Sequence, residues 1–385
     1  MRDFIDSIFS HPSFSVFQKL QNLNVDLYRK LLEKEITLGK LDLKKNKDKI
    51  LFISSDASTR TLKFANPFEI ILHVVISLAL DSLKKVSNIT KVYALRPGKD
   101  LEKSKLSLIF DEIEKYIEYP IKTILQEKLS FLELLSLYNN LKEIKSIDNF
   151  EDILALSDGS YEVNIKRALL FLVRKEKVDK YLSSENLTDI EKYHKKLIFD
   201  DIDKEILAKM ENNFSTFLKN TIFTPKKISS FYLSFYLKNH IKEDKNLFDG
   251  DTPLLDDVSL ANLILDEEEY LILRLPYKEI EGKFYMHVLK NKARELNISL
   301  DLFRIFFKTK QKVFIFETPN KNIISNIKNF LTNIKPFLEE DGEVYPIKLA
   351  DRFSRDLSKK LIKALSYNLK SIIFGLNYRE HDTDY

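Results

Sequence analysis

The stretch that most constrains the fold runs from Lys49 to Ser58 and reads K-I-L-F-I-S-S-D-A-S. Residues Ile50 to Ser54 are apolar or small, favour extended backbone and include neither glycine nor proline, which is typical of a strand buried on both faces. The apolar run stops at Asp56. We therefore expect a carboxylate at the point where this strand leaves the core.

A second copy of the pattern spans Asp152 to Ser160 and reads D-I-L-A-L-S-D-G-S. Residues Ile153 to Leu156 predict the strand, and Asp158 ends it before Gly159. Two strands that each end in serine, aspartate, a small residue and serine can place two acidic groups side by side at one sheet edge. Carboxylate pairs that hold divalent metal ions are usually built in this way.

Composition excludes some classes of site and leaves others open. The chain has 385 residues and no cysteine, which excludes disulfides, thiolate zinc sites and a cysteine nucleophile. This length allows one elaborated domain or two. The 62 Lys and Arg residues nearly balance the 58 Asp and Glu residues, so a DNA-binding surface would have to be a local patch.

No segment has the pattern of a targeting or membrane-spanning element. The N-terminus, M-R-D-F-I-D-S-I-F-S, carries acids where a secretory signal has a basic stretch followed by an apolar one. The longest apolar run, Ile70 to Leu80, is interrupted by His73 and Ser77 and is far shorter than the roughly 20 residues of a membrane helix. We expect a soluble, cytoplasmic protein without a membrane partner.

The pattern of apolar residues along the chain predicts a mixed α/β protein. Extended segments are expected at 61–80, 92–95, 270–275, 302–307 and 312–317, the last two as a hairpin; helices are expected at 1–40 with a break near Pro12, at 101–145 with a break at Pro120, over most of 162–245, and at 283–297, 321–335 and 351–376. The predicted organisation is an N-terminal helical segment at 1–48, an α/β core at 49–376 with a mainly helical insertion at about 162–265, and a polar tail at 377–385.

One acidic residue, Glu133, interrupts a strongly apolar helical stretch. It stands between Phe131–Leu132 and Leu134–Leu135, where a carboxylate would lose part of its hydration and need a cation or hydrogen bonds. The same residue also fits the solvent-facing stripe of the helix. From the helix alone, both interpretations stay open.

The order of the acids along the chain points to a class of enzyme. An Asp on the first strand, a helical Glu and an Asp that ends a later strand form the arrangement of ribonuclease H-like nucleases, in which carboxylates at one sheet edge hold two Mg²⁺ or Mn²⁺ ions. Oxygen ligands suit these hard cations. The sequence contains no Ser/His or Cys/His couple, Walker loop or G-x-G-x-x-G motif that would compete for this role.

In four places the chain resembles the NurA family, the nuclease partner of the HerA DNA-translocating ATPase. The first is Asp56-Ala57-Ser58, where the family usually has Asp-Gly-Ser, and the second is Leu129 to Leu135, which matches L-x-F-L-E-L-L and contains Glu133. The third is Leu156 to Ser160, which matches L-x-D-G-S, and the fourth is Gly342 to Asp351, where the family reads close to G-Y-P-Y-P-L-x-x-A-H. The resemblance spans roughly residues 50 to 355 and implies a ribonuclease H-like mixed sheet flanked by helices.

The fourth motif departs from the family pattern at two positions. The family's first tyrosine falls on Glu343 and its histidine falls on Asp351. Asp351 can still ligate a hard cation, and Tyr345 can cover the lost tyrosine's role of positioning a phosphate. The resemblance thus implies that Asp56 and Asp158 ligate metal, that Glu133 assists, and that Asp351 and Tyr345 complete the site.

The resemblance also implies a function and partners. These are 5′→3′ exonuclease and single-strand endonuclease activity on DNA with Mn²⁺ or Mg²⁺ in a two-metal site, and a homodimer docked on a HerA-type hexameric ATPase. The setting would be DNA end resection in double-strand-break repair, or defence against phage. The alternatives are a non-catalytic adaptor that binds DNA and the ATPase, favoured by the altered fourth motif and Ala57, and a nuclease that acts on RNA.

Simpler structural interpretations apply to the same residues. An Asp beside Gly and Ser at a strand end, like Asp158, is most often part of a turn or a helix N-cap, and Asp351 precedes a predicted helix as an ordinary N-cap would. The basic clusters are usually solvated faces, although a few could line a path for DNA. Among them, Lys359, Lys360 and Lys363 are expected to form the exposed stripe of the last helix.

Overall fold

The computed structural model describes most of the chain. The described residues are 19–41, 50–63, 69–80, 86–93, 121–144, 152–184, 204–226, 228, 230–240, 246–275, 287–298, 301–310, 312–372 and 379–381. The predicted helix at 1–18, the basic residues 44–49 and the predicted helical residues 101–120 lie outside this part.

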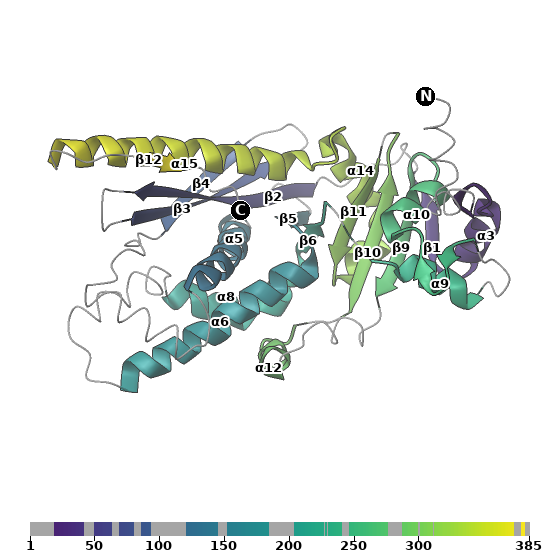
Figure 1. Cartoon of the computed structure of the whole chain (residues 1–385), viewed down its shortest axis with the longest axis horizontal. Coiled ribbons are helices and arrows are strands. Elements are labelled where there is room, and N and C mark those ends of the chain that lie inside the picture. Colours follow the sequence, from purple (N-terminus) through teal and green to yellow (C-terminus); the bar gives the residue numbers. More distant parts are fainter. Residues whose placement is uncertain are drawn as a thin grey trace, which may run out of the picture.

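The described residues form one ten-stranded mixed sheet, shown in Figure 1. Along the sheet the order is β1-β9-β10-β11-β6-β5-β2-β3-β4, and β12 pairs with β2 off this path. Strand β5 is parallel to both β2 and β6, whereas the other pairs are antiparallel. The strands are β1 (Thr37–Lys40), β2 (Ile50–Lys63), β3 (Glu69–Leu80), β4 (Val86–Tyr93), β5 (Asp152–Asp158), β6 (Thr221–Thr224), β9 (Glu269–Leu275), β10 (Leu302–Lys308), β11 (Val313–Thr318) and β12 (Arg379–His381), with a separate small hairpin of β7 (Phe248–Asp249) and β8 (Thr252–Pro253).

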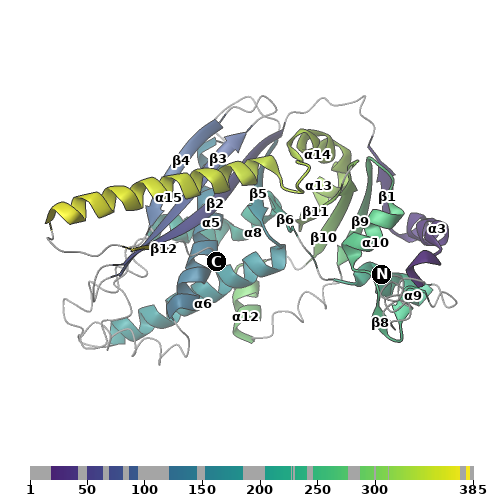
Figure 2. The ribbon, with the colours of Figure 1, turned by 45° about the horizontal axis from the view of Figure 1, so that its top comes forward.

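Helices cover both faces of the sheet. In Figures 1 and 2 the long α15 (Tyr345–Ile372) crosses one face over β2, β3 and β4, and α5 (Ile121–Ile144), α6 (Tyr161–Ser184) and α8 (Lys204–Lys219) lie on the other. A group of short helices flanks the β9–β1 end of the sheet (Figure 1). The remaining helices are α3 (Val25–Glu35), α9 (Tyr232–His240), α10 (Asp257–Ile264), α12 (His287–Glu295), α13 (Lys321–Ser325), α14 (Ile327–Ile334) and the short η2 (Lys335–Phe337).

The double cover explains the uninterrupted apolar run of β2. Its side chains alternate between two cores: Leu51 and Ile53 join the core under α5 and α6, and Ile50 and Phe52 join the core under α14 and α15. Phe52 packs edge to face against two rings of the second core, with ring centroids 6.4 and 5.7 Å away. A strand buried on both faces therefore reads as I-L-F-I and shows no alternation of apolar and polar residues.

The mixed α/β sheet flanked by helices confirms the predicted class, and the hairpin of β10 and β11 is present. Two strands lie in segments that were predicted to be helical, and β12 lies in the predicted polar tail. Strand β6 lies inside the segment expected to be a mainly helical insertion, and β1 lies inside the N-terminal segment expected to be helical. Strands β6 and β1 are only four residues long, too short to produce a pattern that competes with the helical periodicity beside them.

Two boundaries also differ from the prediction. Strand β2 does not end at Asp56, because it stays paired with β3 as far as Lys63. Helix α15 begins at Tyr345, six residues before Asp351, so Asp351 lies within the helix and is not its N-cap. None of the helices in the described ranges is both long enough and apolar enough to cross a bilayer.

Candidate functional site

The parallel register of β2 and β5 places Asp56 beside Asp158. The pairing ends at Ser54 and Leu156, and the same register continued by two residues brings Asp56 next to Asp158, whose charge raises the pKa of the Asp56 carboxyl. Because side chains alternate with period two, both carboxylates lie on the face that carries Phe52 and Leu154. The two acids predicted to form a pair are thus on the same face, on neighbouring strands.

Helix α15 covers this face and is fixed to β2 by a series of hydroxyl contacts. The Ser54 hydroxyl donates to the carbonyl of Pro346 at 2.8 Å, and the hydroxyls of Ser58 and Ser358 are 2.9 Å apart. Between these contacts, the Ser354 hydroxyl donates to Oδ2 of Asp56 at 2.8 Å. Asp56 is therefore hydrogen-bonded to α15 and remains partly exposed.

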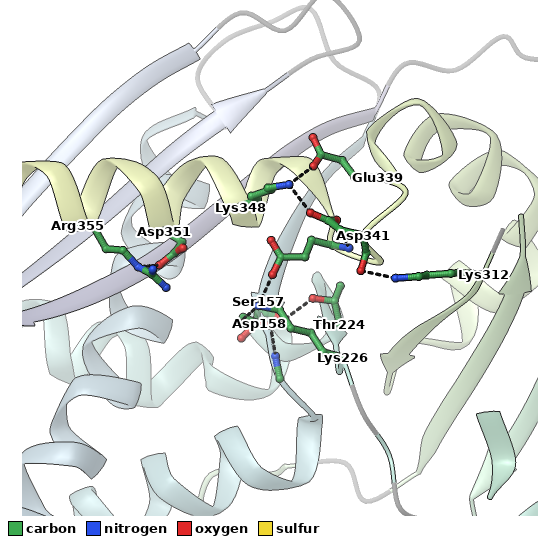
Figure 3. Close-up of polar contacts among 12 residues, drawn as sticks. Ser157, Asp158, Thr224, Lys226, Lys312, Glu339, Asp341, Lys348, Asp351 and Arg355 are labelled. Atoms are coloured by element: carbon green, nitrogen blue, oxygen red, sulfur yellow. Dashed lines mark hydrogen bonds and ion pairs between the residues drawn. The ribbon is translucent and has the colours of Figure 1, made fainter. Parts of the chain in front are cut away.

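Asp158 ends β5 in a tightly bonded turn. Gly159 has φ +84°, a conformation that suits glycine, and its N–H donates to Oδ1 of Asp158 at 2.9 Å. The carbonyl of Asp158 accepts from the side-chain amide of Asn164 at 2.5 Å. The other carboxylate oxygen lies 3.4 Å from Nζ of Lys226, which is also 3.0 Å from the Glu343 carboxylate (Figure 3).

Asp351 lies one turn before Ser354 on α15 and is paired with a cation. Nε of Arg355 donates to Oδ1 of Asp351 at 2.7 Å, an i,i+4 contact along the helix that Figure 3 shows. Arg355 is exposed, whereas Asp351 is only partly so. The negative charge of Asp351 raises the pKa of the nearby Asp56 carboxyl.

Burial and neighbouring acids strongly perturb Asp56. Burial raises the pKa of its carboxyl most, Asp351 and Asp158 add to this, and the Ser354 hydrogen bond and Arg355 oppose it, leaving a value of about 7. Within the described part of the chain, Asp56 forms no ion pair. A cation that pairs with this carboxyl would stabilise its charged form.

Glu133 approaches the two aspartates from α5, which lies on the other face of the sheet. Its carbonyl accepts from the Ser55 hydroxyl at 2.9 Å, which fixes this turn of α5 against β2. Burial, then the charges of Asp56 and Asp158, raise the pKa of Glu133 well above its usual value, and Arg167 opposes the shift. The side chain is half-buried, so it lies neither on an open solvent stripe nor fully in the core.

The fourth motif, residues 342–351, leads into α15 and includes its first residues. Tyr345 is the first residue of the helix and packs, partly buried, against the core under α14 and α15. Glu343 lies on a pocket beside Asp158 and reaches Lys226. This pocket is lined by Asp158, Thr224, Pro225, Lys226, Val313, Phe314, Ile315, Gly342, Glu343, Val344 and Ile347.

The donor chemistry fits a hard divalent cation, but the side chains as placed do not surround one point. In the ranges given above, no three His, Cys, Asp or Glu side chains are grouped closely enough to hold a metal ion. Lys226 pairs with Asp158, and Arg355 pairs with Asp351. Asp56 and Glu133 supply oxygen ligands whose mutual repulsion a divalent ion would relieve.

Three residues of this group were not predicted to lie at the site, and the sequence marked Lys226 only as part of a basic cluster. Lys226 follows the short strand T-I-F-T and Pro225, a β-branched and aromatic run that would have been the signal for β6. Ser354 and Arg355 lie three and four residues after Asp351, the spacing that places side chains on one face of a helix. A prediction in which the helix started before Asp351 would have placed Ser354 and Arg355 next to Asp351 on one face of that helix.

Comparisons with known proteins give the following result. No protein-family model matches the chain, and no curated protein matches it significantly. One similar solved structure is the NurA nuclease from Sulfolobus solfataricus, with TM-score 0.46 and 14% identity over 97% of this chain and 99% of that chain. Another is NurA bound to dAMP and manganese, with TM-score 0.39 and 12% identity over 88% of this chain and 93% of that chain. Both of these solved structures are of NurA, and they cover 97% and 88% of this chain.

Proposed function

We propose that this chain is a metal-dependent nuclease that hydrolyses phosphodiester bonds of DNA at the site built from Asp56, Asp158 and Glu133. The observation that carries the proposal is the register of β2 and β5, which sets Asp56 beside Asp158 on one face. Glu133 lies close enough to both for its pKa to be raised by them. Three acids held so close that they repel one another destabilise the fold. A structural role does not explain this cost, whereas binding of a cation explains it.

In this proposal Asp56, Asp158 and Glu133 hold Mn²⁺ or Mg²⁺ in a two-metal site, and Asp351 completes the ligand set. When bound, the ions supply a water activated for attack and charge stabilisation of the transition state. Lys226 pairs with Asp158 and is displaced from it by the ions. Ser354 orients Asp56 by its hydrogen bond, and Tyr345 positions a phosphate at the start of α15.

We further propose that the site sits on a ribonuclease H-like core. The antiparallel strands β2, β3 and β4, followed by β5 and β6 parallel to β2, provide the sheet for such a core. The predicted acids then fall at β2, at the helix after β4 and at the end of β5. Strands β9 to β11 extend this core beyond β6.

The finer activities and partners rest on the resemblance of the four sequence motifs. They are 5′→3′ exonuclease and single-strand endonuclease activity on DNA, a homodimer, and docking on a HerA-type hexameric translocase in end resection or phage defence. Size-exclusion chromatography with light scattering, alone and with such an ATPase, tests the two assembly proposals. A monomer that does not bind the ATPase would contradict both.

The test of the activity is cleavage of end-labelled linear and circular single-stranded DNA with Mn²⁺, Mg²⁺ or EDTA. We expect wild-type cleavage with metal, a loss of at least about a hundredfold in Asp56→Asn and Asp158→Asn, and unchanged cleavage in Asp251→Asn. Asp251 is a suitable control because it is an exposed aspartate that pairs with Lys238, away from the site. Equal cleavage by Asp56→Asn and wild type would refute the proposal, and preference for RNA over DNA would change its substrate.

The alternative is a nuclease-fold adaptor that binds DNA and the ATPase without cutting. It is favoured by the two ion pairs in which Lys226 and Arg355 already occupy Asp158 and Asp351. It predicts DNA binding without cleavage even when the ATPase is present. It also predicts that Mn²⁺ leaves the melting temperature unchanged, whereas a nuclease with the proposed site is stabilised by Mn²⁺.

A further inference from the structure

The exposed face of α15, which lies opposite the face that carries Ser354, is a basic stripe. After Asp351, the exposed side chains of this helix are mostly cationic: Arg352, Arg355, Lys359, Lys360 and Lys363, with Asp356 as the exposed acid and Tyr367 beyond them. At 100° per residue these positions fall within an arc of roughly 140° of the helix surface. From Arg352 to Tyr367 the stripe extends about 22 Å along the helix axis.

The stripe is held rigidly with respect to the site. The opposite face of α15 packs on β2 and β3, where Ser354 bonds to Asp56 and Ser358 bonds to Ser58. Arg60 of β2 also donates to the Ser358 hydroxyl at 3.4 Å. In Figure 2 α15 lies straight across these strands and begins beside β5. A ligand along the stripe would therefore be held at a fixed position relative to Asp56, across the width of α15, without any rearrangement of the helix.

Most of the cations on the stripe are not neutralised by the protein. Arg355 pairs with Asp351, but Arg352, Lys359, Lys360 and Lys363 form no ion pair within the described ranges. Like charges at i,i+4 spacing, such as Lys359 and Lys363, destabilise a helix slightly. An extended polyanion would relieve this repulsion along the whole stripe.

We propose that a single DNA strand lies along this basic stripe, with its phosphates on Arg352, Lys359 and Lys363 and a base stacked on Tyr367. The inference rests on the proposed function, because the polyanion that continues from a phosphodiester-cleaving site is the substrate itself. Tyr367 is 77% exposed at the far end of the stripe, and an exposed ring is a stacking surface for an unpaired base. One row of cations on a convex helix suits one strand.

The test measures binding of a fluorescein-labelled 20-nucleotide single strand by anisotropy, in EDTA, over a series of NaCl concentrations. The variant Lys359→Gln/Lys363→Gln should lower the slope of log K against log salt by about 1.4, because each phosphate contact to a single strand contributes about 0.7. The matched control is Lys177→Gln/Lys180→Gln, which removes two exposed lysines from α6 on the other face of the sheet. It should keep the wild-type slope.

A third variant separates stacking from charge. Tyr367→Ala should weaken binding about tenfold and leave the salt slope unchanged. A Lys359→Gln/Lys363→Gln protein with the wild-type slope would overturn the inference, as would an equal change in the α6 control or a wild-type protein that binds duplex in preference to the single strand.

Because EDTA removes the metal, this outcome is distinct from the outcome of the cleavage test. Binding that depends on the stripe, in a protein that does not cut, would refute the nuclease and leave the inference intact. Cleavage by a protein whose DNA binding does not depend on the stripe would support the nuclease and overturn the inference.

Discussion

The carboxylate of Glu317 on β11 accepts a hydrogen bond from the backbone N–H of Tyr161, the first residue of α6, at 2.9 Å. Glu317 is buried and bonds through its other oxygen to Nε and Nη2 of Arg304, at 2.9 and 2.8 Å. Arg304 in turn reaches Asp257 at 3.3 Å. The turn that follows Asp158 is thus anchored by a buried ion pair on strands far away in the sequence.

We expect Glu317→Gln to impair the Asp158 end of the site. The amide can replace only one of the two interactions, so either the Tyr161 N–H or Arg304 loses its acceptor. The Mn²⁺ concentration for half-maximal cleavage should rise about tenfold. Hydrogen exchange of the peptide that covers the start of α6 should also become faster.

The matched control is Glu127→Gln, which also disrupts a buried Glu–Arg pair, with Arg174, but bonds to no part of the Asp158 turn. Glu127→Gln should lose stability while keeping the wild-type Mn²⁺ dependence. If both variants shift the Mn²⁺ dependence equally, the Glu317 contact has no special role in the site.

The acids on strands were accessible from the sequence because their signal is local. Asp56 and Asp158 each follow a short apolar run, and the copies I-L-F-I and I-L-A-L imply strands that can be neighbours. The parallel register, which pairs the strands as far as Ser54 and Leu156, brings the two acids near each other two residues later. Where the pattern was local and repeated, sequence and structure agree.

The contacts made to these acids depend on long-range packing and could not be derived. Lys226 reaches Asp158 only because β6 pairs with β5, and Ser354 reaches Asp56 only because α15 lies across β2. The apolar sequence around Glu133 left two interpretations open, and the charges of distant acids set its electrostatic state. A helix pattern alone contains none of this information.

The pKa of Asp56 predicts an opposite effect of one substitution on stability and on activity. The carboxyl has an ordinary pKa of 3.8 and a folded-state pKa of about 7, so between these values the folded protein holds a proton that the unfolded chain has released. Its contribution to stability is therefore fully present below about pH 4 and is lost as pH rises through about 7. Above pH 7 the folded protein contains a buried charge.

Asp56→Asn removes that charge and can still accept the Ser354 hydrogen bond. We expect its melting temperature to exceed that of wild type by a few degrees at pH 8 and to equal it near pH 4, while cleavage is lost. Thermal melts across this pH range are the measurement. A variant less stable than wild type at pH 8 would show that burial of the Asp56 charge is not costly.

Lys226 competes with a metal ion for Asp158. Because the lysine is exposed, its ion pairs with Asp158 and Glu343 should stabilise the fold by no more than about 1 kcal/mol. Lys226→Gln should therefore leave the melting temperature almost unchanged and lower the Mn²⁺ concentration for half-maximal binding, measured by calorimetry without DNA. Lys238→Gln, which breaks one exposed pair with Asp251, is the control and should leave Mn²⁺ binding unchanged. Weaker Mn²⁺ binding in Lys226→Gln would contradict the competition.

Substitutions at two glycines with positive φ allow the loss of stability from backbone strain to be distinguished from a loss of activity at the site. Gly159 has φ +84° and Gly250 has φ +61°, so alanine at either position should cost about 1 to 2 kcal/mol. A Cβ at Gly250 would meet nothing within 4 Å, whereas a Cβ at Gly159 would lie 3.3 Å from Nδ2 of Asn164.

That nitrogen donates to the carbonyl of Asp158, so only Gly159→Ala forces a shift next to the proposed metal ligand. Urea denaturation should show similar losses of stability for Gly159→Ala and Gly250→Ala. Cleavage with Mn²⁺ should fall about tenfold in Gly159→Ala alone. Because the two variants share the strain of positive φ, a difference in activity reports the geometry of Asp158. Equal activity in the two would mean that the turn after β5 does not control that geometry.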